Sequence, residues 1–556
     1  GDAAPPTEGA GGAGEGIGIA IALVVLLITF GSLVTAGMPL LTSVFGVGIG
    51  LTGIVALSAV ADLSSAVVSL AAMLGLAVGI DYALFIISRY RALAQRGMSR
   101  EAAAGQAVGT AGTAVVFAGL TVIIALAALL VTGVPFMTAM GLAAAGTVAI
   151  AVLIAITLVP ALLGFAGPRA LKGKRTEPAD DRRTLGLRWV DFVMRHRLAA
   201  IGVVVAATAG LAIPATHLRL GLPDDASKPA GTAQRIGSDL LTKGFGEGFN
   251  GQLTIVAELR EAAGAKTAAN AIGGRLAELD DVAAVAPAQL TPDGRLAIIS
   301  LTPSSGPSSI ATKDLVRTIR DRETTLTRGT GADLSVTGTT AVNIDVVDKM
   351  GSALIPYLAV IVVLAFLLLM IAFRSILVPL TAVGGFLLSV AAALGAMVAV
   401  FQDGFGAGLI GVSEAAPIVS LIPILTIGIL FGLAMDYQVF LVSGMREAHA
   451  HGASARDAVR KGFHGSARVV TAAGLIMVSV FAGFILPDDP IVKSIGFALT
   501  AGVLIDAFLI RMTLIPALMS LLGERAWWFP RALDRVIPDV DIEGARLAPA
   551  AMPQPA

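Results

Sequence analysis

Long apolar runs alternate with short polar segments along most of the chain, and this pattern predicts membrane-spanning helices. A helix of about 20 apolar residues is long enough to cross the hydrocarbon core of a bilayer. Eleven runs of about this length occur: 17–36, 38–60, 64–88, 110–132, 138–164, 197–216, 352–373, 376–400, 416–443, 467–486 and 493–522. We therefore expect a predominantly α-helical, polytopic membrane protein.

The loops between these runs predict an orientation. Lys and Arg cluster in loops 88–100, 165–197 and 445–468, whereas loops 133–137 and 401–415 contain neither residue. Basic loops remain on the cytoplasmic side of a membrane. The N-terminus is therefore expected outside and the C-terminal tail inside.

One long segment, residues 218–351, is polar and falls on the outer side in this orientation. Its pattern reads β-α-β-β-α-β, and Asp293-Gly294 provides a hairpin turn between the middle strands. The expected strands are Gln252–Glu258, Val282–Gln289, Arg295–Leu301 and Ala332–Thr337, and the expected helices are 262–278 and 309–325. This order predicts one external α+β domain of ferredoxin-like topology.

The two hydrophobic halves of the chain resemble each other. Residues Gly79–Ser88 align with Ala434–Ser443 at an offset of 355, and Thr157–Leu162 aligns with Thr513–Leu518 at an offset of 356. Five spans of one half map onto five spans of the other. Repeats of the same orientation predict a pseudo-twofold axis along the membrane normal.

The repeat also predicts how the domains are organised. The second half is preceded by an extra span and an external domain, so a helix and a first external domain are expected to precede Gly1 in a longer parent of twelve spans. The expected segments are an external stub of that missing domain (1–16), transmembrane helices 2–6 (17–167), a cytoplasmic basic loop (168–196), helix 7 (197–217), the external domain (218–351), helices 8–12 (352–522) and a cytoplasmic tail (523–556).

Composition excludes several classes of protein. Hydrophobic residues make up 56% of the chain and charged residues 14%, against about 25% charged in an ordinary soluble domain. A soluble enzyme and a disordered protein are therefore excluded. With 39 basic and 39 acidic residues, the chain lacks the positive charge that nucleic-acid binding requires. The absence of cysteine and of paired histidine motifs predicts no metal site.

Asp81 and Asp436 provide the clearest candidate chemistry. Each lies inside a long apolar run, each is followed by a tyrosine (Tyr82 and Tyr437), and the two pairs occupy equivalent repeat positions. A charged side chain at the centre of a bilayer costs roughly 2.5–3.5 kcal/mol on insertion scales. Matched pairs at such sites favour a proton relay, and a structural hydrogen bond between helices is the alternative. Neighbouring residues point about 100° apart on a helix, so we expect Asp81 to reach Tyr437 and Asp436 to reach Tyr82.

Two further features surround these acids. Small residues four apart allow helices to pack closely, and they flank the acids at Gly75, Gly79, Gly428 and Gly432. In the last span, Asp506 and Arg511 lie five residues apart. They form either a local ion pair or part of the functional site.

At this point the chain resembles a known family. Ile80-Asp-Tyr-Ala-Leu-Phe85 and Gly432-Leu-Ala-Met-Asp-Tyr-Gln-Val-Phe440 are similar to the paired motifs of the MMPL transporters. These form the mycobacterial-membrane-protein-large branch of the resistance-nodulation-division superfamily, and the similarity extends over essentially the whole chain. Gln438 departs from the family pattern, in which an acidic residue is usual.

The resemblance implies a secondary active transporter, not an enzyme. It implies export of lipids or other hydrophobic compounds across the plasma (inner) membrane, driven by the proton gradient without a further cofactor. The residues that carry protons in the family correspond to Asp81, Tyr82, Asp436 and Tyr437, and the external domain corresponds to a porter domain that guides substrate. The expected partners are the substrate and membrane lipids, and a homo-oligomer or accessory envelope proteins are compatible with this picture. The composition is compatible with an actinobacterial source.

Three other readings remain open. The same mechanism serves efflux of drugs or small hydrophobic compounds. A lipid sensor of the same fold would bind lipid without net transport. An intramembrane aspartyl protease also uses two aspartates, but it requires YD and GxGD motifs, and both acids here occur in the order Asp-Tyr.

Overall fold

The computed structural model describes residues 11–57, 65–171, 184–222, 224–227, 231–260, 264–412, 415–487 and 489–530. The chain forms two compact units. The helical unit comprises residues 1–217, 353–399 and 421–556, and the α+β unit comprises 218–352 and 400–420. The expected N-terminal stub, the basic segment 172–183 and the C-terminal tail lie wholly or largely outside the described residues.

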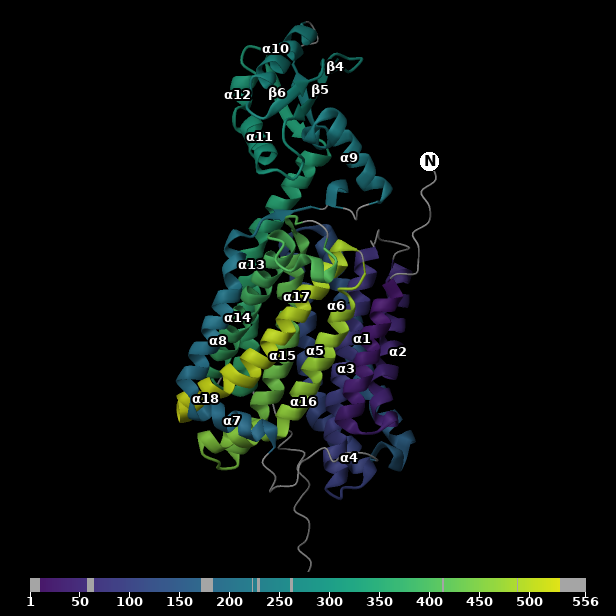
Figure 1. The fold of residues 1–556 in the computed structure, drawn as a ribbon, viewed down its shortest axis with the longest axis vertical. Helices are drawn as coiled ribbons and strands as arrows, with labels where there is room; N and C mark the ends of the chain where they lie inside the picture. Colours follow the sequence, from purple (N-terminus) through teal and green to yellow (C-terminus); the bar gives the residue numbers. More distant parts are fainter. Residues whose placement is uncertain are drawn as a thin grey trace, which may run out of the picture. The chain divides into compact units, whose positions relative to one another are not determined.

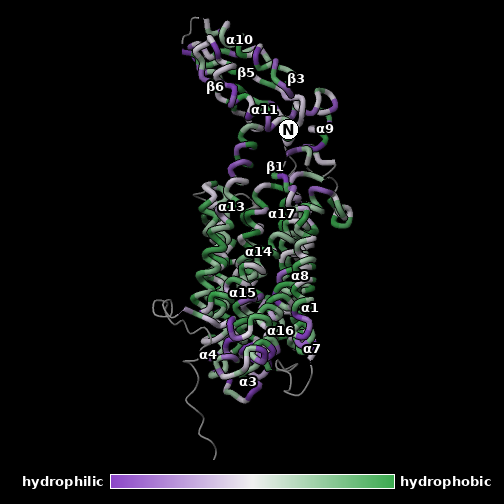
Figure 2. Tube along the Cα trace, turned by 90° about the vertical axis from the view of Figure 1, so that its left-hand side faces the viewer, coloured by the Kyte–Doolittle hydropathy of each residue, from purple (hydrophilic) through white to green (hydrophobic). Residues whose placement is uncertain are grey.

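The helical unit consists of long apolar helices (Figure 1), and Figure 2 shows their hydrophobic character along most of their length. Its principal elements are α1 (Gly11–Phe30), α2 (Leu33–Leu57), α3 (Ser65–Gln95), α4 (Arg100–Ala107), α5 (Thr113–Ala127), α6 (Pro135–Ala166), α7 (Leu185–Arg195), α8 (Arg197–Ala212), α13 (Thr339–Phe373), α14 (Leu377–Met397), α15 (Leu421–Ala450), α16 (Ala455–Gly483), α17 (Pro490–Leu504), the π-helix η9 (Ile505–Leu514) and α18 (Ile515–Leu522). Helix α13 contributes residues to both units.

Ten helical segments among the described residues are long and apolar enough to cross a membrane. They correspond to ten of the eleven predicted spans. The eleventh, predicted at 17–36, corresponds to a shorter apolar stretch, Gly16–Phe30. That prediction ran too far because Gly31 has a φ of +67°, a left-handed conformation that ends a helix.

A second boundary also differs from the prediction. The span predicted to begin at residue 352 belongs to a helix that begins at Thr339. The early turns of α13 are polar, and they bind α11 (Ile310–Asp321) through ion pairs between Asp345 and Arg320, at 2.6 Å, and between Asp348 and Arg317, at 2.9 Å. Hydropathy marks where a helix becomes apolar rather than where it begins.

Helices α3 and α15 form the interior of the helical unit. In each, 94% of the apolar stretch is buried, compared with 11% for the span that contains α8. Helix α3 packs against α2, α6 and α16, and α15 packs against α5, α16 and α17. The repeat-related helices α5 and α16 therefore cross over, each contacting the central helix of the other half.

The α+β unit contains a β-sheet packed against helices, and its strands and helices follow in the predicted order. Strand alternation places one face of β2 (Leu253–Leu259) and β5 (Leu296–Pro303) in a core shared with α10 (Ala265–Ala277) and α11. The sheet has the order β3-β5-β2-β6, with β3 at Val282–Val285 and β6 at Ala332–Thr337, and all of its pairings are antiparallel. A short strand, β4 (Gln289–Leu290), also pairs with β5.

The predicted hairpin turn at Asp293-Gly294 is present. Gly294 has a φ of +66°, and Asp293 accepts hydrogen bonds from the Thr291 hydroxyl at 2.6 Å and from the Arg295 N–H at 3.2 Å. These two hydrogen bonds hold the pKa of Asp293 below its ordinary value. The turn fixes the register of β4 and β5.

Two segments of this unit were not predicted. Helix α9 (Ala233–Phe245) precedes β2, and residues 400–420 join the unit although they follow an apolar span. They join through β7 (Ile418–Val419), which pairs in parallel with β1 (Leu220–Gly221). Gln402 supports the junction by accepting the Arg219 backbone N–H at 2.7 Å.

A pair of glycines on α14 tests the packing of the helical unit. A Cβ at Gly395 would lie 1.9 Å from the Leu211 carbonyl oxygen of α8, whereas a Cβ at Gly384 meets nothing within 4 Å. We expect Gly395→Ala to lower the free energy of unfolding by about 1–3 kcal/mol. Gly384→Ala, the matched control, should raise it by about 0.5–1 kcal/mol through helix propensity. Thermal unfolding in detergent, followed by circular dichroism, would compare them, and equal shifts would contradict this packing.

Candidate functional site

The central helices bring the two predicted acid–tyrosine pairs into one buried cluster. Asp81 and Tyr82 lie on α3, Asp436 and Tyr437 lie on α15, and each of the four side chains is at most 2% exposed. Asp436 interacts electrostatically with Asp81, and Tyr437 interacts with both acids. We call these four residues the acid–tyrosine cluster.

Hydrogen bonding in the acid–tyrosine cluster is incomplete. The Tyr82 hydroxyl lies close enough to Asp436 to interact with its carboxylate, but it does not form a hydrogen bond of regular geometry. Among the described residues, Asp81 Oδ1, both oxygens of Asp436 and both tyrosine hydroxyls have no hydrogen-bond partner. Buried polar groups without partners are rare and point to a functional role. Carboxyl and phenol groups in this state can bind, release or exchange protons.

The four predicted packing glycines lie beside the cluster and face outward from it. A Cβ at Gly75 would lie 2.7 Å from Thr147 of α6, and a Cβ at Gly79 would lie 2.9 Å from Ser43 of α2. Gly428 admits the Tyr357 hydroxyl of α13, and Gly432 admits Val122 of α5. The glycines therefore let neighbouring helices close around α3 and α15. They do not form a contact between the two central helices.

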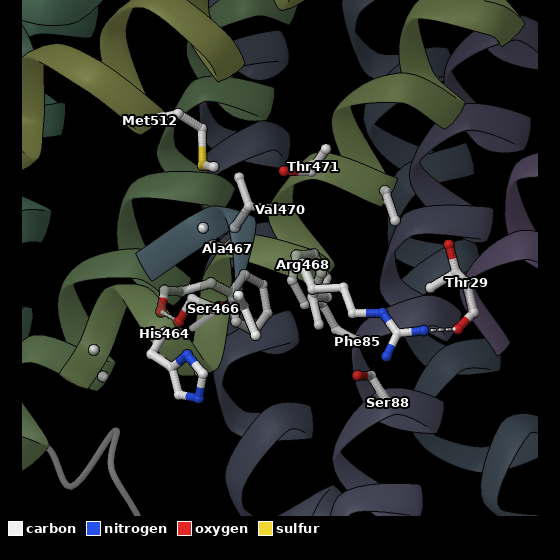
Figure 3. Close-up of a pocket in the computed structure, with 18 of the residues that line it drawn as sticks. Thr29, Phe85, Ser88, His464, Ser466, Ala467, Arg468, Val470, Thr471 and Met512 are labelled. Atoms are coloured by element: carbon white, nitrogen blue, oxygen red, sulfur yellow. Dashed lines mark hydrogen bonds between the residues drawn. The ribbon is translucent and has the colours of Figure 1, made fainter. Parts of the chain in front are cut away.

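An aromatic pair joins α3 to α15. The rings of Phe85 and Phe440 stack with centroids 3.5 Å apart and an interplanar angle of 7°. Each phenylalanine follows its aspartate by four residues, which is about one helical turn or roughly 6 Å. The pair also lines a cavity of about 1750 Å³ in the helical unit. Figure 3 shows this cavity, with Phe85 and Ser88 near Arg468. The stacked rings thus line the cavity about one helical turn from the acids, which do not line it.

A buried ion pair on η9 contacts α15 through Gln438. Arg511 and Asp506, both on η9, are 0% and 2% exposed, and Arg511 Nε donates to Asp506 Oδ2 at 3.1 Å. Arg511 also donates to the side-chain carbonyl of Gln438, and the Ser389 hydroxyl donates to Asp506 at 3.3 Å. The predicted local pair is therefore present, and Gln438 connects it to α15 two residues from Asp436.

The π-helical form of η9 explains this pairing. A π-helix bonds residues five apart, so side chains at i and i+5 lie together, as Asp506 and Arg511 do. The repeat offset rises from 355 at Gly141/Gly496 to 356 at Thr157/Thr513, so the second half contains one extra residue where the π-helix occurs. The corresponding part of α6 is α-helical. That change of offset was the sequence signal for the π-helix.

A second repeated contact lies at the ends of α1 and α13. Arg91 donates to the Phe30 carbonyl at 3.0 Å, and the equivalent Arg446 donates to the Ala372 carbonyl at 2.7 Å. Both arginines satisfy carbonyl groups that a helix leaves free at its C-terminus. Each half thus uses its central helix to hold the end of an apolar helix.

Comparison with known families gives a match over most of the chain. The model of the MMPL family matches residues 4–200 and 243–538. The chain is 48% identical to "Membrane protein YdfJ" of Bacillus subtilis, covering 96% of this chain and 73% of YdfJ. It is 35% identical to "Heme uptake protein MmpL11" of Mycobacterium tuberculosis and 34% identical to "Mycolic acid-containing lipids exporter MmpL11" of Mycolicibacterium smegmatis. These matches cover 94% of this chain and about half of either relative (54% and 55%).

Solved structures of comparable fold include that of SecDF. A crystal structure of SecDF in its super-membrane-facing form has a TM-score of 0.51 and 12% sequence identity, covering 92% of this chain and 61% of SecDF. This likeness concerns the fold alone. Among the described residues, no group of three or more metal-binding side chains occurs.

The buried ion pair generates one prediction. Arg511→Met leaves Asp506 as an unpaired buried charge, and breaking a buried pair in this way destabilises a protein by about 3–5 kcal/mol. The double variant Asp506→Leu/Arg511→Met removes both charges and should recover most of that loss. Thermal unfolding of the three proteins in detergent would measure the difference. A double variant no more stable than Arg511→Met would contradict the ion pair.

The aromatic pair generates another. We expect Phe440→Ala to open a path from the cavity to the acid–tyrosine cluster, so that a water-soluble carbodiimide labels Asp81 or Asp436 several-fold faster than in the wild type. Phe431→Ala is the matched control, because Phe431 is also buried on α15 but packs against Phe386, outside the cavity lining. Mass spectrometry of labelled peptides would read the result. Equal labelling of both variants would show that the stacked rings do not separate the cavity from the acids.

Proposed function

The chain belongs to the MMPL family of membrane transport proteins, and from that membership we propose proton-driven export. In this proposal, protons move inward across the plasma membrane and drive lipids or other hydrophobic compounds outward. The chain acts as a secondary active transporter that needs no cofactor beyond the proton gradient.

The acid–tyrosine cluster is the observation that carries this proposal. Two carboxyl groups and two hydroxyl groups lie together in the membrane interior without regular hydrogen-bond partners among the described residues. A structural role would be served better by acids that pair with an opposite charge, as Asp506 does with Arg511. Residues that must accept and release protons need such unfilled capacity. We therefore assign Asp81, Tyr82, Asp436 and Tyr437 to a proton relay.

The mechanism follows from charge and from helix packing. A deprotonated Asp436 attracts the Tyr82 hydroxyl as a hydrogen-bond donor, and a proton arriving on the carboxylate weakens this attraction. Because Tyr82 lies on α3 and Asp436 on α15, each protonation changes the force between the two halves. The membrane potential supplies about 2.3 kcal/mol per proton per 100 mV. This energy drives a relative movement of the halves.

The α+β unit has a place in the same proposal. We assign it to the outer side of the membrane as a ferredoxin-like porter domain that guides substrate, because basic residues cluster in loops that alternate with this segment along the sequence. Its sheet order and its two helices on one face are compatible with this topology. The pseudo-twofold repeat of the helical unit completes the proposed architecture.

The names of two relatives point to two different substrates and to opposite directions of transport. One MmpL11 is named an exporter of mycolic acid-containing lipids, and another is named a heme uptake protein. Both cargoes combine large apolar surface with polar groups. Lipid export remains our proposal, and proton-driven uptake of an amphiphile such as heme is the second candidate.

A genomic test separates these functions. Asp436→Asn and Asp81→Asn would be introduced at the locus that encodes the chain, and cellular and surface lipids would be compared by mass spectrometry. We expect one lipid class to accumulate inside and to fall at least tenfold at the surface, because Asn has the shape of Asp but does not titrate. The matched control is Asp293→Asn, which makes the same change at an exposed hairpin.

The outcomes differ for each candidate. Unchanged lipids in both relay variants would contradict lipid export. Loss of heme-dependent growth without a lipid change would favour uptake, and increased drug susceptibility alone would favour efflux of small compounds. A change caused by Asp293→Asn as strong as that caused by Asp436→Asn would contradict the relay.

A further inference from the structure

The cavity lined by the Phe85–Phe440 pair is large enough to hold a ligand. Its volume of about 1750 Å³ exceeds the roughly 300–1,000 Å³ of pockets for drug-sized ligands. Residues from α1, α3, α7, α15, α16 and η9 line it, so both halves of the helical unit contribute. A cavity of this size can hold a long amphiphile as well as water.

Its lining is divided into an apolar and a cationic part. Ile28, Trp189 and Leu475 line it and are 62%, 44% and 42% exposed. The cavity is therefore open along an apolar wall. Phe508 and Met512 extend this wall.

The cationic part lies farther along the helices from the acid–tyrosine cluster. Arg89 follows Phe85 on α3 by four residues, or about 6 Å along the axis, and Arg96 directly follows the end of α3. Among the residues that the structure describes, five cationic side chains line the cavity, compared with one carboxylate, that of Glu447. The cations are Arg89, Arg96, Arg188, Lys461 and Arg468.

Two of these cations are available to a ligand. Arg468 donates to the Thr29 carbonyl, as Figure 3 shows, and Arg89 donates to Thr110 at 3.3 Å. Lys461 and Arg188, in contrast, are exposed and have no ion pair or hydrogen bond from their side chains within the described residues. Lys461 is on α16 and Arg188 is on α7, so two elements present unneutralised charge to the same cavity.

Helix α7 is held in position to form this wall. Asp191 pairs with Arg460 of α16 at 3.0 Å, and Trp189 Nε1 donates to the Met512 carbonyl of η9 at 3.0 Å. Leu185, Trp189 and Phe192 recur at helical spacing and line the cavity. Such a helix is typical of the boundary between headgroups and acyl chains.

We propose that this cavity binds one anionic glycerophospholipid, with its phosphate at Lys461 and Arg188 and an acyl chain along the apolar wall beside Trp189. Charge complementarity selects the anionic headgroup over a zwitterionic one, and the open wall admits the chain from the bilayer. The proposal concerns binding alone and does not depend on proton-driven export.

Fluorescence of Trp189 provides a direct test. The chain has three tryptophans, so the full chain with Trp527→Phe and Trp528→Phe retains Trp189 as its single tryptophan, which is excited selectively over tyrosine at long wavelength. This protein would be titrated in mixed micelles with brominated phosphatidylglycerol or brominated phosphatidylcholine, which quench tryptophan on contact. We expect half-maximal quenching at a much lower mole fraction of phosphatidylglycerol, by about fivefold for each cation engaged.

Paired double variants distinguish specific binding in the cavity from general attraction of anionic lipid to a positively charged surface. Arg188→Gln/Lys461→Gln should abolish the preference for phosphatidylglycerol, and Arg188→Lys/Lys461→Arg should retain it. Arg195→Gln/Arg456→Gln, which removes the same charge from the same two helices outside the cavity lining, should also retain it. Melting temperatures would confirm that all variants fold.

Several results would overturn the proposal. Equal quenching by the two brominated lipids would show no headgroup selection. Loss of preference in both Gln double variants would indicate general attraction to the surface. Reversal of quenching by inorganic phosphate would identify a soluble anion as the ligand. Asp436→Asn should leave the preference unchanged, because Asp436 does not line the cavity, so failure of the relay and failure of this site are distinguishable.

Discussion

The architecture depends on keeping two carboxyl groups away from lipid. Hydrocarbon solvates neither a charge nor an unpaired polar group, so the helices that carry Asp81 and Asp436 must be enclosed by other helices. Ninety-four per cent of the apolar stretch of α3 and of α15 is buried. Glycines on both helices let their neighbours approach closely enough for this, and the crossing of α5 and α16 ties each half to the central helix of the other. The long apolar helices around them follow from this requirement.

The helical unit holds buried charge in two different ways. Asp506 has a guanidinium, a serine hydroxyl and a π-helical backbone arranged around it, so its charge is compensated in place. Asp81 and Asp436 have only each other and two tyrosines, with several atoms unsatisfied among the described residues. The first arrangement is suited to a permanent ion pair. The second is suited to groups whose charge changes during a cycle. Gln438 links the two arrangements, because it accepts a hydrogen bond from Arg511 and follows Asp436 on α15 by two residues.

Some features of the fold and the site could be predicted from the sequence because they stand out against the pattern of hydrophobic and polar residues. An aspartate inside an apolar run is conspicuous, and strand alternation in 252–337 exposed the order of the sheet. Phe85 and Phe440 could not be identified, since phenylalanine is ordinary in such a run and only the fold shows that the rings stack. The β1–β7 pairing joins two-residue strands almost 200 residues apart, too short to leave a periodic signal. The helix extension at Thr339 was missed because it is polar. The π-helix did leave a trace, the one-residue change of repeat offset.

That extra residue makes the two halves chemically unequal. The position equivalent to Gln438 is Ala83, and the first half has no counterpart of the Asp506–Arg511 pair near its own acid. Asp436 therefore lies two residues from a side chain that contacts a fixed ion pair, whereas Asp81 lies two residues from an alanine. In an assembly with two identical halves, the two acids would have identical surroundings. The extra residue, together with Gln438 and the ion pair that it contacts, thus gives the two acids of an otherwise twofold assembly different surroundings.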